Sequence, residues 1–111
     1  MTPANLKKLM SLLLIATGIL HLVVAATGAP ADLKTPLAGF GAAYSVLGLV
    51  VWRGGRIAII GAMGVCAVGL ALGGSRYLQN GGPATLLLMF LIDVAVIGAG
   101  ALWIMKSGKT S

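Results

Sequence analysis

Four long stretches of the sequence hold a single charged residue between them, and they constrain the fold more than any other feature. They cover residues 9–26, 37–52, 57–74 and 84–105. A bilayer core about 30 Å thick is crossed by about 20 helical residues. A segment that spans the bilayer core finds no water to hydrogen-bond its backbone, so it must be helical or part of a closed barrel. These runs lack the alternation of apolar and polar residues that is typical of strands. The sequence therefore predicts an all-α integral membrane protein, with one four-helix transmembrane bundle as a single domain over residues 1–111.

The composition excludes a water-soluble globule. Apolar residues make up 59% of the chain and charged residues 9%, against roughly 45–50% and about 25% in soluble domains. The formal net charge is +6, but the basic residues stand in ones and twos between the apolar runs. This placement indicates membrane-surface anchors and no nucleic-acid partner. The single cysteine, Cys66, excludes an intrachain disulfide and any site built from several cysteines.

The distribution of lysine and arginine predicts the orientation. The connection over residues 53–56 is so short that the second and third helices must be antiparallel neighbours. With four spans, both termini and this connection share one side, which carries six of the eight basic residues, whereas Lys34 and Arg76 lie on the other. The positive-inside rule then predicts cytoplasmic termini and a multi-pass protein of the bacterial inner (plasma) membrane. The predicted surface anchors are Lys7, Lys8, Arg53, Arg56, Lys106 and Lys109.

The first span has a second interpretation. Lys7 and Lys8, the apolar stretch after them and Ala25-Ala26 together resemble a secretory signal that would be cleaved. The apolar stretch is about 18 residues long, beyond the usual 7–15 of such a segment, and it contains His21. We therefore expect this span to be retained as the first helix.

Small and polar residues predict which faces pack. Lipid tails are as apolar as leucine, so membrane helices associate through close contact of small residues. Helical spacing predicts a compact bundle with its polar residues inside, and the pair Gly69 and Gly73 fits either internal packing or a dimer seam. The predicted inward stripes are Ser11, Gly18, His21 and Ala25; Gly41, Tyr44 or Ser45, Gly48 and Trp52; Ala62, Cys66, Gly69 and Gly73; and Met89, Asp93 and Gly100.

Asp93 is the most informative polar residue. It lies ten positions into the fourth run, about 15 Å from Pro83 and so near the midplane. An aspartate at this depth costs about 2.5–3.5 kcal/mol on insertion scales. Two interpretations are open. Asp93 is either a proton-exchanging or ligand-binding acid, or a protonated residue that holds the bundle together through a hydrogen bond.

His21 and Tyr44 extend the candidate intramembrane polar site. By helical rise they lie about 8 Å and about 12 Å from the outer face, so Tyr44 is intermediate in depth between His21 and Asp93. A hydrogen-bonded chain of His21, Tyr44 and Asp93 is therefore one hypothesis. In the other, each side chain bonds a backbone carbonyl or a hydroxyl such as that of Thr17 or Ser45.

Short motifs across the chain resemble those of one family. They are Gly18-Ile19-Leu20-His21, residues 44–48 with Leu49, Arg76 followed by Gly82-Pro83, and an acid in the fourth helix, Asp93. With these motifs the chain resembles the DoxX-like four-helix small bacterial membrane proteins, mostly of uncharacterised function. The resemblance implies a four-helix bundle and almost nothing about activity. Some members carry an arginine early in the second helix, where this chain has Gly39-Phe40-Gly41.

The sequence contains no catalytic, cofactor-binding or metal-binding motif, so we expect neither an enzyme nor a cofactor. The leading hypothesis is an accessory component that contacts lipid or a partner, the partners being membrane lipid, a larger membrane complex or a second copy. One alternative is a small proton-coupled transporter that uses Asp93. Another is a redox component that binds quinone or haem through His21, where two histidine ligands to haem would require a homodimer.

Overall fold

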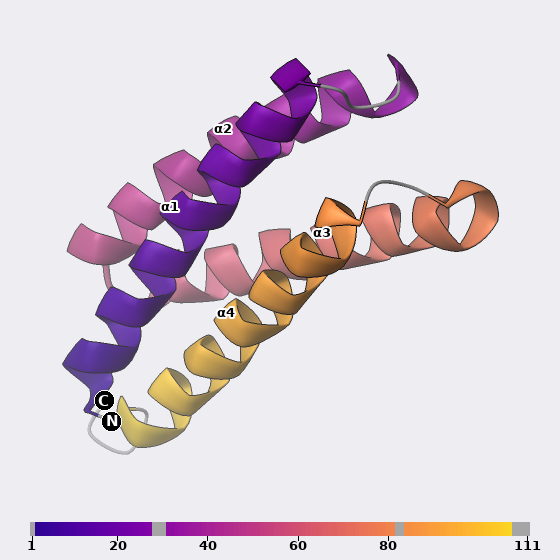
Figure 1. Ribbon diagram of the computed structural model, residues 1–111. Coiled ribbons are helices and arrows are strands. Elements are labelled where there is room, and N and C mark those ends of the chain that lie inside the picture. The colour runs from indigo at the N-terminus through magenta and orange to yellow at the C-terminus, as the bar shows by residue number, and fades with distance from the viewer. Residues whose placement is uncertain (1, 28–30, 82–83, 108–111) are drawn as a thin grey trace.

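The computed structural model describes residues 2–27, 31–81 and 84–107, and it contains four helices (Figure 1). They are α1, Pro3–Thr27; α2, Ala31–Arg53; α3, Arg56–Asn80; and α4, Thr85–Ser107. Each helix is long and apolar enough to cross a membrane. The predicted all-helical class is therefore confirmed, and the four apolar helices indicate a multi-pass membrane protein.

The helices extend beyond the apolar runs that predict them. α1 begins at Pro3 instead of about residue 9, and proline is favoured at the first helical position because its missing N–H has no partner there. α2 begins at Ala31, with Asp32 in its first turn, where a negative charge favours the helix dipole. Pro36 is the sixth residue of α2 and so lies beyond its first turn. α3 continues to Asn80, so Arg76 belongs to the helix and does not follow it.

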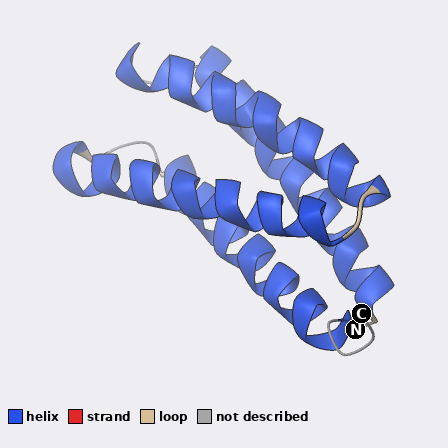
Figure 2. Ribbon diagram, turned by 180° about the vertical axis from the view of Figure 1, so that it is seen from behind, coloured by secondary structure: helices blue, strands red, loops and turns tan. Residues whose placement is uncertain are grey.

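The four helices form two pairs that separate toward one end. α1 packs along both α2 and α4, and α3 packs on α4, whereas α2 and α3 share much less contact. Both views show α1 and α2 diverging from α3 and α4 toward the last residues of α1 and of α3 (Figures 1 and 2). The start of α1 and the end of α4 lie together at the opposite end (Figure 1). The bundle is elongated, with extents of 46 × 23 × 19 Å.

The close contact of α1 with α2 rests on small residues. The Ser11 hydroxyl donates to the Gly48 carbonyl oxygen at 2.6 Å. Gly18 faces the backbone of α2 at Gly41 and Ser45. The inward stripes of α1 and α2 are therefore confirmed at these buried residues. Trp52 is the exception, because half of its surface is exposed and it faces outward at the end of α2.

Candidate functional site

A cavity of about 290 Å³ lies between the two helix pairs, in the part of the bundle where α2 and α3 diverge. All four helices contribute to its lining, and most of its surface is apolar. It reaches from the start of α2 and the end of α3 to the middle of α4. The apolar wall includes Leu33, Leu37, Phe40, Leu72, Met89 and Phe90.

The cavity gathers the scarce polar residues of the chain. The protein has two acidic residues and one histidine, and Asp32, Asp93 and His21 all line this cavity. Of the basic residues that the structure describes, Arg76 is the one in its lining. A cavity with apolar walls and a few converging polar groups is the usual form of a small-molecule site. These four side chains therefore define the candidate site.

The inner end of the cavity is formed by Asp93 on α4. Its side chain is 2% exposed, and the Tyr44 hydroxyl and the Cys66 thiol are its polar neighbours. Within the described chain, neither Oδ1 of Asp93 nor the Tyr44 hydroxyl has a hydrogen-bond partner. An unpaired buried polar group is costly. Asp93 therefore places a buried carboxyl group, with one oxygen unpaired, in the lining of the cavity.

Gly69 on α3 makes room for these two groups. A Cβ built at this position would collide with the Tyr44 hydroxyl and would lie 3.6 Å from Oδ2 of Asp93. The stripe of small residues along α3 thus has a local role here, since glycine lets the backbone of α3 approach the polar groups of α2 and α4. Gly69 serves internal packing, which was one of the two interpretations of the Gly69 and Gly73 pair.

His21 lies beside Tyr44 but is bonded to its own helix. The two rings meet edge to face, with centroids 5.0 Å apart. Nδ1 of His21 lies 2.6 Å from the Thr17 carbonyl oxygen, and because a carbonyl only accepts, Nδ1 carries the proton. Nε2 is then the acceptor of the neutral ring.

The structure thus brings the three predicted site residues together without the predicted hydrogen-bonded chain. His21, Tyr44 and Asp93 are all buried and adjacent. The bond from His21 to the Thr17 carbonyl is the alternative that the sequence left open. Ser45 likewise donates to the Gly41 carbonyl oxygen at 2.8 Å.

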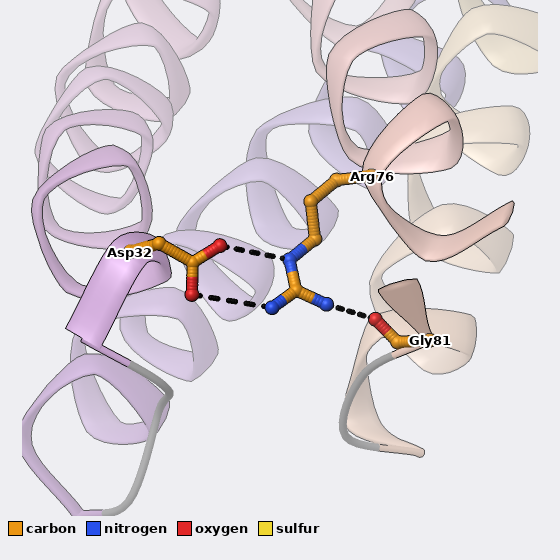
Figure 3. Close-up of polar contacts among 3 residues, drawn as sticks. All are labelled: Asp32, Arg76 and Gly81. Carbon is orange, nitrogen blue, oxygen red and sulfur yellow. Dashed lines mark hydrogen bonds and ion pairs between the residues drawn. The ribbon is translucent and has the colours of Figure 1, made fainter. Parts of the chain in front are cut away.

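An ion pair crosses the outer end of the cavity. Arg76 on α3 donates from Nε to Oδ2 of Asp32 at 3.1 Å and from Nη2 to Oδ1 at 3.2 Å (Figure 3). Its Nη1 donates to the Gly81 carbonyl oxygen. The pair connects the start of α2 to the end of α3, where the two helices otherwise diverge. The pair was not predicted, because Arg76 lies beyond the third apolar run and was assigned only to the outer side of the membrane.

The predicted surface anchors lie at the end away from the ion pair. Lys7 and Lys8 are in the first two turns of α1, Arg53 ends α2, Arg56 begins α3 and Lys106 is the penultimate residue of α4. All but the half-buried Lys7 are exposed. Lys109 lies outside the described residues. The two ends of the bundle therefore differ in charge, with these five basic residues at one end and the cavity, with Lys34, Arg76 and Asp32, at the other.

Within residues 2–27, 31–81 and 84–107, no group of three His, Cys, Asp or Glu side chains is placed to hold a metal ion. No family model, no curated protein and no solved structure matches the chain.

Proposed function

We propose that the chain is an accessory protein of the bacterial inner membrane, without catalytic activity, that binds one small amphipathic molecule in the cavity between its helices. One observation carries this proposal. The buried carboxyl group of Asp93, whose Oδ1 has no hydrogen-bond partner within the described chain, lines the inner end of a cavity whose walls are apolar. A ligand with an apolar body and one polar end would place that end at this carboxyl group.

The surroundings of the site support a ligand taken from the lipid phase. Leu72 lines the cavity while 60% of its surface is exposed, so at this residue of α3 a single side chain separates the cavity from the surface that would face lipid in a membrane. A volume of about 290 Å³ lies at the lower end of the roughly 300–1,000 Å³ typical of ligand pockets. This size favours a small compound with one ring or a short chain over a two-chain phospholipid.

Cavity filling tests the proposal with a matched pair of variants. Leu72 and Leu12 are both 60% exposed, but Leu12 on α1 is outside the cavity lining. We expect a photoreactive diazirine analogue of 4-phenylbutanol to crosslink to lining residues of the purified protein and of Leu12→Trp. In Leu72→Trp the indole occupies part of the cavity, and crosslinking should fall at least tenfold. Peptide mass spectrometry reads the crosslinked positions, and equal labelling of both variants would contradict cavity binding.

We also propose that both termini face the cytoplasm, so that the cavity opens toward the opposite side. The positive-inside rule supports this orientation, because the basic anchors lie at the end of the bundle that holds the termini. A fluorescent-protein fusion after Ser111 should fluoresce, and a phosphatase fusion at the same position should be inactive. A phosphatase inserted in the loop over residues 28–30 should be active. The reverse pattern would reject the orientation and leave the cavity unaffected.

The two other functions stay predictions, as does the resemblance to the DoxX-like proteins. Proton-coupled transport is favoured by the unpartnered oxygen of Asp93, since a transported proton needs an acceptor within the bundle. A quinone or haem site at His21 would use Nε2, the ring nitrogen left as acceptor by the bond to Thr17.

A further inference from the structure

We propose that the cavity takes small lipophilic amines, with the ammonium group of the ligand bound to the Asp93 carboxylate and its apolar part against the walls of α2, α3 and α4. This inference rests on the proposed function, that the cavity binds a small amphipathic molecule, and it names the chemical class of that molecule.

The charge of the lining is opposite to that of the chain. The protein carries a net charge of +6, yet two acids and one cation line the cavity. Arg76 and Asp32 pair with each other at its outer end. The carboxyl group left without a cationic partner in the lining is that of Asp93. A cation is therefore the ion that complements this cavity.

Arg76 offers little to an anionic ligand. Three of its five N–H groups already donate to protein oxygens, those of Nε and Nη2 to Asp32 and that of Nη1 to the Gly81 carbonyl (Figure 3). An anion bound to the two remaining N–H groups would lie beside the carboxylate of Asp32, and in the cavity it would also approach the carboxyl group of Asp93. A carboxylate or phosphate ligand is thus disfavoured at both ends of the cavity.

The polar groups at the inner end of the cavity accept hydrogen bonds, so they complement a ligand that donates them. Asp93 and His21 both line the cavity; the carboxylate of Asp93 accepts hydrogen bonds, and Nε2 of His21 is also an acceptor. An ammonium group has three donors and no acceptor. Its attraction to a carboxylate is much stronger in a medium of low dielectric constant than in water. An amine therefore fits these acceptors better than an alcohol of the same shape.

The apolar walls set the size of the ligand. Gly69, near Asp93, and Arg76, at the outer end, are seven residues apart on α3, which corresponds to about 10 Å. Phe40 and Phe90 contribute aromatic rings to the wall between these ends. A phenyl ring on a short alkyl chain spans this distance and packs against the rings, with the amine at Asp93.

Three compounds of one shape and different charge test the inference. 4-Phenylbutylamine, 4-phenylbutanol and 4-phenylbutyrate compete with the photoreactive alcohol for crosslinking to the wild-type protein at neutral pH. We expect the amine to compete at a concentration at least tenfold lower than the alcohol, and the butyrate to be the weakest. In Asp93→Asn the advantage of the amine should fall to less than threefold while competition by the alcohol is retained, and Asp93→Glu should keep the advantage.

The outcomes separate this inference from the proposed function. If the alcohol labels the cavity but the amine has no advantage over it, or the butyrate competes as well as the amine, the ligand class is wrong and cavity binding stands. The same holds if Asp93→Asn keeps the full advantage of the amine. If the alcohol does not label the cavity of the wild-type protein, the proposed function itself fails. If Asp93→Asn does not fold, the ligand class is tested by the ranking of the three compounds on the wild-type protein and on Asp93→Glu.

Discussion

Replacing Gly18 or Gly41 by alanine should lower the free energy of unfolding by about 1–3 kcal/mol, the range for overpacked sites. A Cβ on Gly18 would lie 2.8 Å from the Gly41 carbonyl oxygen and 2.8 Å from the Ser45 backbone nitrogen. A Cβ on Gly41 would lie 2.9 Å from the Gly18 carbonyl oxygen. These contacts are with backbone atoms, which cannot turn aside as a flexible side chain can. The two helices would have to separate.

The same helix offers a matched control. Gly39 is two residues from Gly41 on α2, and a Cβ there meets nothing within 4 Å. Gly39→Ala should leave the free energy of unfolding unchanged or raise it by up to about 1 kcal/mol, because alanine loses less conformational freedom in a helix. Unfolding in mixed micelles with increasing fraction of denaturing detergent measures all three variants. Equal losses at Gly39 and Gly41 would mean that the contact of α1 with α2 does not depend on glycine.

The position of these glycines could be predicted from the sequence, because membrane helices associate through small residues. Helical spacing alone placed Gly18 with Ser11 on one face and Gly41 with Gly48 on another. Both faces are buried where α1 meets α2. Trp52 was assigned to the same face by spacing but is half exposed. Spacing gives no depth, and a bulky side chain at the end of a helix can turn outward.

The helix ends could not be predicted from hydropathy. An apolar run marks the part of a helix that suits lipid, whereas the helix continues as long as its backbone bonds are made. α2 therefore starts at Ala31, well before the apolar run, and α3 ends after it at Asn80. These extensions place Asp32 and Arg76 on helices, close enough to pair. The ion pair is thus a tertiary feature that no local pattern indicates.

The candidate site was predicted in part. The depth of His21, Tyr44 and Asp93 along their helices suggested a cluster, and the structure makes them neighbours. The predicted hydrogen bonds between them depend on helix rotation, which depth does not give. For His21 a carbonyl one turn earlier on its own helix, that of Thr17, is the nearer acceptor. The cavity itself results from the divergence of α2 and α3, and only the assembled bundle reveals it.

Gly69→Ala should lower the free energy of unfolding by about 1–3 kcal/mol, and removal of one hydroxyl should reverse most of this loss. The new Cβ would collide with the Tyr44 hydroxyl, whereas the next atom in its surroundings, Oδ2 of Asp93, lies at an ordinary contact distance of 3.6 Å. Tyr44→Phe removes the colliding atom. Because that hydroxyl has no hydrogen-bond partner within the described chain, Tyr44→Phe alone should cost less than about 1 kcal/mol.

A double-mutant cycle measures this relation. We expect a coupling energy of about 1–2 kcal/mol between Gly69→Ala and Tyr44→Phe, within the range for residues in direct contact. Gly64→Ala is the matched control on α3, since a Cβ there meets nothing within 4 Å, and its effect should be the same with tyrosine or phenylalanine at position 44. If Gly69→Ala costs the same in both backgrounds, the hydroxyl does not lie against Gly69. The inner end of the cavity would then be built differently, because the approach of α3 to Tyr44 and Asp93 is what places both groups there.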